Sequence, residues 1–371
     1  MNTSTSASPE VVPAAASSTA PGGEPQPGSP QPGSPQSRRA SGVEVARRAG
    51  VSQKTVSRVV NGEPNVSDDV RRRVLRAAEE LGYRPNSAAR ALLTGRSRRL
   101  GVVWLGSALY GPSHMLVTLE HAARAQGYSL SLSASGPAGQ TQAAVDALLA
   151  QGVDGIVIDE PVDDHPLLTG SSPVPVMSLG WSRADADASI EVAGQDWRPP
   201  ITEAVQHLLQ LGHSTVHHIS GPLTWWTARD RRDAWREALL AAQRPCPPSL
   251  PGDWSAASGY RAARHLLEDS SVSAIFCAND EMAIGAIRAA VEAGLQVPKD
   301  VSVIGLDDIP AAEFLNPPLS TIRQEFEAVV DVAIARLVDR IEGRAVPTAT
   351  PFPIVPAFIS RGTTAAPPAH R

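Results

Sequence analysis

Apolar residues near the N-terminus recur with a helical period over three short segments. Ser41, Ser52 and Ser67 stand where helix N-caps are expected, and Gly50 and Gly82 end the first and third segments. The inward faces consist of Val45, Ala46 and Ala49 in the first segment, Val56, Val59 and Val60 in the second, and Val66, Val70, Val74, Ala78 and Leu81 in the third. Three helices around a small core, with a tight turn between the first two, predict a helix-turn-helix domain over residues 38–84.

From Leu100 onward, short apolar runs alternate with longer segments of helical period. Strands are predicted at 100–105, 129–133, 155–159, 174–179, 216–220, 274–277 and 301–306. Helices are predicted near 114–126, 139–151, 199–211, 228–242, 256–268, 281–293 and 324–342. This alternation predicts an α/β fold with mainly parallel sheets and helices on both faces. Its length and the polar clusters at several strand ends predict two such lobes with a ligand cleft between them.

Three further segments lack the composition of a packed core. Residues 1–37 are rich in Pro, Gly, Ser, Ala and Gln, and they hold too little apolar surface to offset the entropy of ordering, so this tail is expected to be disordered. Residues 85–97 hold a short helical pattern and a linker, and a helix of this length is marginal in isolation. Residues 363–371 are expected to form a flexible C-terminal tail.

Charge is unevenly distributed along the chain. The net charge is −5, but residues 38–99 contain 15 basic and 6 acidic residues, and residues 100–371 carry a net charge of −12. A basic head on an acidic body is typical of a protein that meets phosphates at one end only. With 42% hydrophobic residues, the remainder of the chain can bury a large core.

Several functional classes are disfavoured by what the sequence lacks. Cys246 and Cys277 are far apart and have no zinc-ligand spacing, so neither a zinc module nor a disulfide framework is expected, and a reducing cytoplasm fits. No apolar run approaches about 18 residues and no secretory pattern opens the chain, which predicts a cytoplasmic protein without a membrane partner. No metalloprotease, P-loop or nucleophile-elbow motif occurs, and His213, His217 and His218 are interpreted as structural. No enzyme activity, metal or cofactor is therefore expected.

Two motifs in the basic head carry a resemblance to a known family. AxxAGVSxxTVSRVVN at 46–61 and VSxxxRxxVxxAxxxLGYxPNxxAxxL at 66–92 resemble the DNA-binding head of the LacI/GalR family of bacterial transcriptional regulators. GDWSAASG, ANDEMAIGA, GLDD and PPLSTIRQEF continue the resemblance through nearly all of residues 98–362. It implies an effector-binding core of two periplasmic-binding-protein-like subdomains: 98–195 with 323–352, and 196–322 with 353–362. The implied crossings lie near Asp196, Arg323 and Pro353.

The second helix of the head carries side chains suited to reading DNA. A recognition helix in the major groove contacts base edges through its N-terminal residues, which here are Ser52, Gln53, Lys54, Thr55 and Arg58. Gln can pair with adenine, and Lys or Arg with guanine. The resemblance implies that Gln53 and Lys54 chiefly set the choice of operator. Phosphate contacts are expected from Ser41, Thr55, Ser57, Asn61 and Arg71–Arg73. A solvated polar helix face is the alternative interpretation.

Residues 85–97 are interpreted as a hinge helix followed by a linker. Asn86, Ala89 and Leu92 follow its pattern, and an exposed leucine beside a basic head can wedge between base pairs in the minor groove. The resemblance implies a dimer whose two hinge helices fold on a near-palindromic operator, whereas packing of Leu92 against the core is the alternative. The C-terminus lacks the leucine heptads of a tetrameric family member, so a homodimer is expected.

The resemblance also implies an effector pocket built from strand ends and loops. Sugar hydroxyls require hydrogen-bonding groups, and the apolar face of a sugar stacks on an aromatic ring. The implied polar contacts are Arg231, Asn279, Asp307 and Gln324, with Trp254 as the stacking ring and Leu109, Met115, Thr227, Arg229 and Phe326 as further lining. Each residue alone has a structural alternative: Asn279 could cap a helix, Asp307 a turn, and Trp254 could belong to the core.

The sequence departs from the family pattern at a few positions. Leu105 and Gly180 stand where a sugar-binding member of the family has a serine and an aspartate, so two hydrogen-bonding groups are missing. Aromatic surface is added nearby by Trp181, Trp225 and Trp226. Gly42 replaces an apolar residue at the start of the first helix, which is expected to weaken that turn.

The sequence therefore predicts a sequence-specific transcriptional regulator. In the favoured interpretation it represses sugar-utilisation genes, and a galactoside-like or other glycoside effector bound between the lobes releases it from its operator. A corepressor-type regulator that responds to a purine or another non-sugar molecule is the main alternative. A sugar-binding protein or carbohydrate enzyme without DNA function is a further one.

Overall fold

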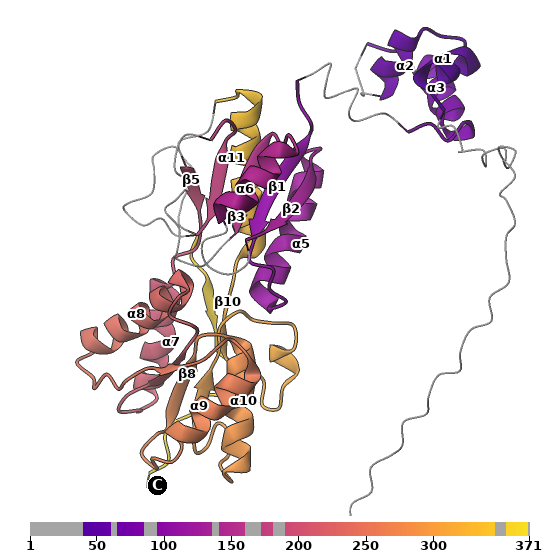
Figure 1. Cartoon of the computed structure of the whole chain (residues 1–371). Helices are drawn as coiled ribbons and strands as arrows, with labels where there is room; N and C mark the ends of the chain where they lie inside the picture. The colour runs from indigo at the N-terminus through magenta and orange to yellow at the C-terminus, as the bar shows by residue number, and fades with distance from the viewer. Residues whose placement is uncertain are drawn as a thin grey trace, which may run out of the picture. The chain divides into compact units, whose positions relative to one another are not determined.

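The computed structural model describes residues 40–60, 65–84, 95–135, 141–159, 172–180, 190–345 and 354–369 (Figure 1). The chain forms two compact units, residues 1–86 and 87–371, which we call the head and the body. Several sequence predictions lie outside the described residues: the tail at 1–37, Asn61, Trp181, Pro353, and the hinge positions Asn86, Ala89 and Leu92.

The head is a domain of three helices, α1 (Gly42–Ala49), α2 (Gln53–Val60) and α3 (Asp68–Glu80). Its buried centre consists of Val45, Ala46, Ala49, Val56, Val59, Val74 and Ala77. Ser41 forms a capping box with Glu44, because the Ser41 hydroxyl accepts a hydrogen bond from the Glu44 N–H and the Glu44 carboxylate accepts one from the Ser41 N–H at 2.7 Å. Gly50 ends α1 at φ 65°, which glycine adopts without a Cβ clash. The predicted helix-turn-helix is confirmed.

Two details of the head differ from the expected pattern, and a third gives Gly42 a packing role. Ser67 occupies the N-cap of α3 but makes no side-chain capping hydrogen bond. Ala77 is buried, whereas Leu81 is 37% exposed beyond the end of α3 and closes no apolar stripe. A Cβ atom at Gly42 would lie 3.2 Å from the hydroxyl of Tyr83, so the glycine leaves room for the tyrosine that packs against the head's core.

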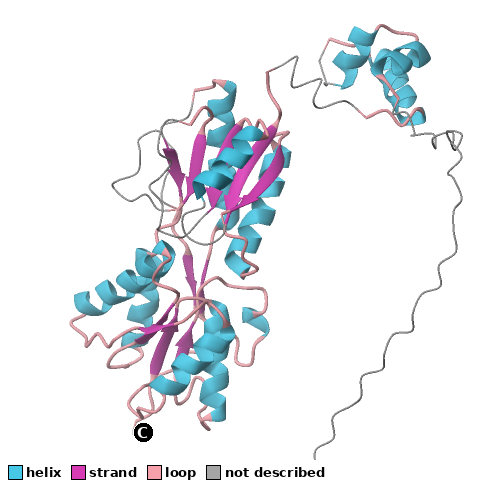
Figure 2. Cartoon of the chain, viewed as in Figure 1, coloured by secondary structure: helices cyan, strands magenta, loops and turns pink. Residues whose placement is uncertain are grey.

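The first lobe of the body, the N-lobe, contains a five-stranded parallel sheet with the order β2-β1-β3-β4-β5. These strands are β1 (Arg99–Trp104), β2 (Ser129–Ala134), β3 (Gly155–Asp159), β4 (Val176–Leu179) and β5 (Ile190–Ala193). The apolar sides of α5 (Tyr110–Ala125) and α11 (Phe326–Glu342) cover one face, and α6 (Thr141–Ala150) covers the other. Figure 2 shows the helices on both sides of the sheet.

The second lobe, the C-lobe, contains a four-stranded parallel sheet with the order β7-β6-β8-β9. Its strands are β6 (His217–Ser220), β7 (Leu250–Pro251), β8 (Ala274–Cys277) and β9 (Ser302–Ile304). One face packs on α7 (Arg198–Gln210) and α8 (Trp226–Ala241), and the other packs on α9 (Ala256–Leu266) and α10 (Asp280–Glu292). The predicted α/β fold with parallel sheets is confirmed.

Short extended segments run between the lobes. Gln195, beyond β5, forms a bridge with Ile354. The strand β10 (Thr321–Arg323) pairs antiparallel with β11 (Ala357–Ile359), and Arg323 also bridges Asp307. The sequence did not predict β5, β7, β10 or β11, which are two to four residues long and show no clear hydrophobic period.

The end of the chain is not the flexible tail that the sequence predicted at 363–371. Thr363 is buried, and its hydroxyl donates to the carbonyl of Val303 at 2.6 Å and accepts from the N–H of Ser320 at 2.8 Å. The Ala365 carbonyl accepts a hydrogen bond from the hydroxyl of Ser302 at 3.1 Å. Hydrophobic periodicity missed this segment because it is held mainly by hydrogen bonds to the edge of β9.

Candidate nucleic-acid interface and effector pocket

The N-terminal turn of α2 presents polar side chains outward. Val56 and Val59 are buried against the rest of the head, which fixes the rotation of α2 and leaves Gln53, Lys54 and Arg58 exposed on the opposite side. Ser52 begins the helix, because its hydroxyl accepts a hydrogen bond from the N–H of Thr55 at 3.1 Å. The predicted base-reading residues therefore share one surface of the head.

The predicted phosphate-contacting residues differ in the hydrogen bonds and ion pairs that they form within the head. The Ser41 side chain belongs to the capping box of α1, and Ser41 is exposed. Arg73 donates a hydrogen bond to the carbonyl of Ala49 at 3.3 Å and pairs with Asp69 at 3.2 Å, so this arginine helps to join α3 to α1. Ser57 is exposed on α2, and Arg71 is half-buried on α3.

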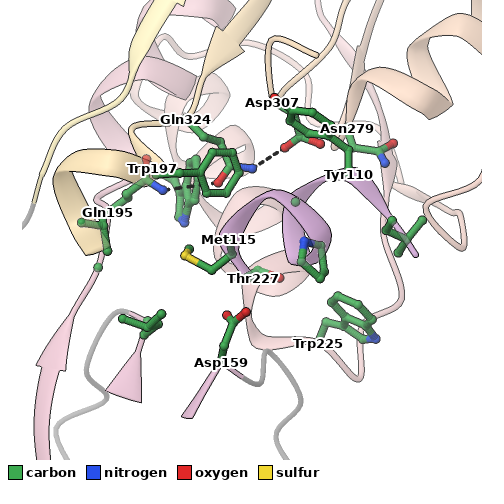
Figure 3. Close-up of a pocket in the computed structure, with 18 of the residues that line it drawn as sticks. Tyr110, Met115, Asp159, Gln195, Trp197, Trp225, Thr227, Asn279, Asp307 and Gln324 are labelled. Atoms are coloured by element: carbon green, nitrogen blue, oxygen red, sulfur yellow. Dashed lines mark hydrogen bonds between the residues drawn. The ribbon is translucent and has the colours of Figure 1, made fainter. Parts of the chain in front are cut away.

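A cavity of about 120 Å³ lies in the body where both lobes contribute residues (Figure 3). The N-lobe supplies residues at the carboxyl ends of β3, β4 and β5, together with the starts of α5 and α11. The C-lobe supplies residues that follow the carboxyl ends of β7, β8 and β9, together with the start of α8. Ligand sites in open parallel sheets lie at this edge, so the topology places the cavity.

Asp307, Gln324 and Arg231 form the polar end of the cavity on the C-lobe side. The Gln324 side chain donates a hydrogen bond to the Asp307 carboxylate and accepts one from Gln195 at 3.3 Å. Arg231 is buried, lies 3.8 Å from the Asp307 carboxylate, and donates to the carbonyl of Ala278 at 2.6 Å. Burial raises the pKa of Asp307 well above its usual range, and Arg231 opposes that shift.

Trp254 and Asn279 are held in place by each other. The Asn279 side chain caps α10 by accepting from the N–H of Met282 at 2.9 Å, and it donates to the carbonyl of Trp254 at 2.9 Å. Trp254 has a φ of 72°, and its indole lies where a Cβ atom on Gly221 would be only 2.2 Å away. The predicted cap and the predicted pocket position are thus both observed for Asn279. An Ala-sized side chain at 221 is incompatible with this indole position.

Arg231 also lies against two tryptophans. Its guanidinium carbon is 4.6 Å from the ring centre of Trp197 and 5.5 Å from that of Trp254. Burial lowers the pKa of Arg231, and the carboxylate of Asp307 opposes this. Tyr110 from the start of α5 lies edge-on to Phe326 at 6.2 Å on the N-lobe side. The cavity is therefore polar at one end and largely aromatic around it.

Nine of the ten predicted effector residues line this one cavity. They are Leu109, Met115, Thr227, Arg231, Trp254, Asn279, Asp307, Gln324 and Phe326. Arg229 does not line it: the Arg229 guanidinium donates to the carbonyl of Leu223 at 2.6 Å, so that pocket assignment is corrected. On α8, Arg229 is two positions from Thr227 and from Arg231, and helical neighbours at that spacing do not share a face.

The sequence missed several lining residues. They include Tyr110, Asp159, Gln195, Trp197 and Val329, while Trp225 and Trp226 line the cavity as the expected aromatic addition. Asp159 was available as a polar residue at the end of a predicted strand. Trp197 and Gln195 carried no such signal, because a non-periodic loop brings them to the cavity.

Among the residues that the structure describes, no group of three or more His, Cys, Asp or Glu side chains could hold a metal ion. His213 instead bonds to Ser273 at 2.8 Å, and His218 is buried between Trp235 and Phe276. Burial lowers the pKa of His218 to about 3, so this imidazole is neutral. No helix in the described part of the chain has the length and apolar character of a membrane span.

A helix-turn-helix head followed by a two-lobed body with a small-molecule cavity defines a ligand-responsive DNA-binding regulator. Residues 43–86 match the bacterial regulatory proteins of the lacI family, and residues 205–364 match a periplasmic binding protein-like domain. The Lactose operon repressor of Escherichia coli (strain K12) is 36% identical over 330 residues, which cover 87% of this chain and 90% of the relative. The chain belongs to the lacI family of bacterial regulatory proteins.

Other relatives extend this similarity to different regulators. The Ribose operon repressor of Escherichia coli (strain K12) is 32% identical over 80% of this chain and 92% of the relative. The HTH-type transcriptional repressor PurR of Photorhabdus laumondii is 33% identical over 80% of this chain and 89% of the relative. All of these relatives are named as repressors.

Solved structures show the same architecture. A lac repressor dimer bound to operator and the anti-inducer ONPF aligns with a TM-score of 0.76 and 34% identity, covering 89% of this chain and 100% of that one. A complex of the transcriptional regulator CelR with cellobiose aligns with a TM-score of 0.61 and 29% identity, covering 88% of this chain and 100% of that one.

Proposed function

We propose that this regulator is a cytoplasmic homodimer that represses sugar-utilisation genes and leaves its operator when a sugar binds between the lobes. The observation that carries the proposal is the cavity that sets Asp307, Asn279 and Gln324 beside the indole of Trp254. Hydroxyls and an apolar sugar face match these two kinds of group. The size also fits one sugar ring, because about 120 Å³ holds roughly ten water-sized groups.

On DNA, Gln53, Lys54 and Arg58 read base edges in the major groove, and Leu92 wedges into the minor groove from the hinge. Roughly 6–10 phosphate contacts would lower affinity by on the order of 10³–10⁵ between 50 and 200 mM salt. Effector binding and operator binding are coupled by about 1–3 kcal/mol, and the coupling acts equally in both directions.

Dimerisation is supported by apolar side chains that stay exposed in one chain. Val117 on α5 and Leu132 on β2 are 53% and 47% exposed on the N-lobe, and Phe314 on the C-lobe is 79% exposed. Covering these side chains in an interface would remove apolar surface from water. A symmetric dimer would present two heads to a pseudo-palindromic operator.

A purine or other corepressor is the second candidate effector class. Four tryptophans around the cavity could stack on a nucleobase as well as on a sugar, and the HTH-type transcriptional repressor PurR is among the relatives. Calorimetry of the full chain with a panel of sugars and nucleobases separates the two. Binding of a nucleobase that strengthens the operator complex, with no response to any sugar, would replace the sugar proposal.

The test combines operator binding with effector response. An operator selected from genomic fragments is bound by the purified dimer, and a sugar that binds by calorimetry should weaken that complex. Asp307→Ala should abolish the sugar response and leave operator affinity unchanged, because Asp307 lies in the body and not in the head. Failure of the wild-type protein to bind any operator sequence at any salt concentration would end the proposal.

A further inference from the structure

Asp159 is the last residue of β3 and the only charged side chain that the described N-lobe strands place in the cavity lining. Figure 3 shows its carboxylate pointing into the cavity, toward Met115 and Thr227. Its neighbours on the same wall are the ends of β4 and β5, Leu179 and Ala193, which are apolar. The half-buried carboxylate of Asp159 therefore faces the cavity from strand ends that are otherwise apolar.

The residue at the end of the adjacent strand, Gly180, carries no side chain. Gly180 directly follows β4, and a Cβ atom at 180 would lie 2.5 Å from the indole of Trp226. Trp226, the first residue of α8, thus fills the volume that a side chain at 180 would need. Asp159 lies one strand away, at the end of the neighbouring β3.

The described part of the chain offers Asp159 no hydrogen-bond or ion-pair partner. Other carboxylates of the body differ: Asp154 accepts from the N–H groups of Ser97 and Arg98, and Asp280 accepts from Thr321 and Ile309. Burial without a compensating group raises the pKa of Asp159 to about 7. A carboxylate that points into a cavity without a protein partner can accept a hydrogen bond from a bound ligand or from water.

The charges around the cavity limit what that ligand can be. Arg231 is the one basic side chain in the described lining and lies 3.8 Å from Asp307 on the C-lobe side, so ionised Asp159 has no basic neighbour on the N-lobe wall. Ionised Asp159 would repel a phosphate or carboxylate on the ligand, and this repulsion is stronger in a low-dielectric cavity than in water. A neutral hydroxyl can instead donate a charge-assisted hydrogen bond to the Asp159 oxygens.

We infer that Asp159 is a specificity-determining residue: it accepts hydrogen bonds from hydroxyls of a neutral sugar and excludes phosphorylated and acidic sugars. This inference deepens the proposed sugar response and rests on it. Asp159 contributes from the N-lobe, and Trp226, Asp307 and Asn279 contribute from the C-lobe. A bound sugar ring would then be hydrogen-bonded from both lobes.

The first test needs no ligand and compares Asp159→Asn with Asp154→Asn by thermal unfolding of the full chain at pH 8.5. Removing an unpartnered charge should raise the midpoint of the body's transition by about 2–4 °C, whereas removing the charge of hydrogen-bonded Asp154 should lower it. A fall for Asp159→Asn that matches the fall for Asp154→Asn would mean that Asp159 is a structural residue, and the inference would be overturned.

The second test measures binding by calorimetry with D-glucose, D-galactose, lactose and cellobiose, and with D-glucuronate, D-galacturonate and the corresponding hexose 6-phosphates. Wild-type protein should bind a neutral sugar at least tenfold more tightly than its acidic counterpart. Asp159→Asn should weaken the neutral sugar by about 10- to 100-fold and narrow the gap between neutral and acidic forms. Asp154→Asn should bind like the wild type, because Asp154 does not line the cavity.

The outcomes separate this inference from the proposed function. If neutral sugars bind and Asp159→Asn binds them within threefold of wild type, the role of Asp159 is refuted and the sugar response stands. If wild-type protein prefers an acidic sugar, the charge argument is refuted. If no sugar of the panel binds, the proposed function and this specificity assignment fall together.

Discussion

The head and the effector pocket assemble their functional side chains in opposite ways. In the head, Gln53, Lys54 and Arg58 lie within six positions of one another on α2, and burial of Val56 and Val59 turns all three outward. In the pocket, Asp159, Trp254 and Gln324 come from segments about 70 to 100 residues apart. A local site depends on one helix, whereas a distributed site depends on two sheets and the strands that join the lobes.

The comparison predicts that damage to one region should not spread to the other. The most severe test is Val45→Asp, which buries a charge in the head's small core. An uncompensated buried charge costs about 3–5 kcal/mol, comparable with the whole stability of a domain of this size. Operator binding in a gel shift should be lost, while sugar binding by calorimetry stays unchanged.

Val43→Asp is the matched control for that variant, because Val43 lies on the same helix and is 48% exposed. Val43→Asp should leave the head folded. Loss of sugar binding in Val45→Asp would show that the body requires a folded head, and the independence of the two units would have to be abandoned.

A second variant should break the pocket and spare the head. Gly221→Ala introduces a Cβ atom 2.2 Å from the Trp254 indole, which must move. Overpacking of this kind costs about 1–3 kcal/mol, so sugar affinity should fall on the order of 10-fold or more. Gly111→Ala, in the N-lobe lining of the same cavity, is a milder comparison, because its Cβ atom would meet nothing closer than Gln324 at 3.9 Å. If Gly221→Ala bound the sugar with the wild-type affinity in calorimetry, the stacking role assigned to Trp254 would be contradicted.

A third variant should alter the head's choice of sequence without altering its stability. Gln53→Ala removes an exposed side chain from α2 and should lose about 1–3 kcal/mol of discrimination at one base pair of the operator. Because Gln53 neutralises no phosphate, the salt dependence of binding should keep its slope. A uniform loss of affinity over all operator variants would place Gln53 on the DNA backbone instead.

The smallest expected effect is a pH dependence confined to the pocket. Burial raises the pKa of Asp159 to about 7, so the folded protein binds a proton that the unfolded chain releases above about pH 4. Stability from this group is therefore present at low pH and is lost as the pH rises from about 4 to about 7. The other titratable groups lining the cavity are Tyr110, Arg231 and Asp307.

Asp280, whose pKa burial also raises to about 7, contributes a slope of the same sign, so the wild-type profile alone does not isolate Asp159. The difference between wild type and Asp159→Asn does. Denaturant titrations at pH 5 and pH 8 should show the variant gaining relative stability at the higher pH. An identical difference at both pH values would mean that Asp159 does not titrate in this range.

The sequence by itself determined most of the head and the repeating strands and helices of the body. Capping by Ser41 and Ser52, the stop at Gly50 and the buried valines all act within one turn of a helix, so they can be read from neighbouring residues. Nine of the residues that the family motifs implied for the pocket line the cavity in the body. What failed was also local in cause: Arg229 is near the right residues in sequence and on the wrong side of α8.

Only the tertiary structure decided how the pocket is finished. In the folded chain the Trp226 indole packs over Gly180, and Asp159 has no partner among the described residues. Gln195 and Trp197, which lie where the chain crosses between the lobes, line the cavity. The tertiary structure also fixed Thr363 on the edge of β9. These contacts join residues far apart in the chain through packing and hydrogen bonds. A hydrophobic period cannot encode them, because it records only which face of an element is buried.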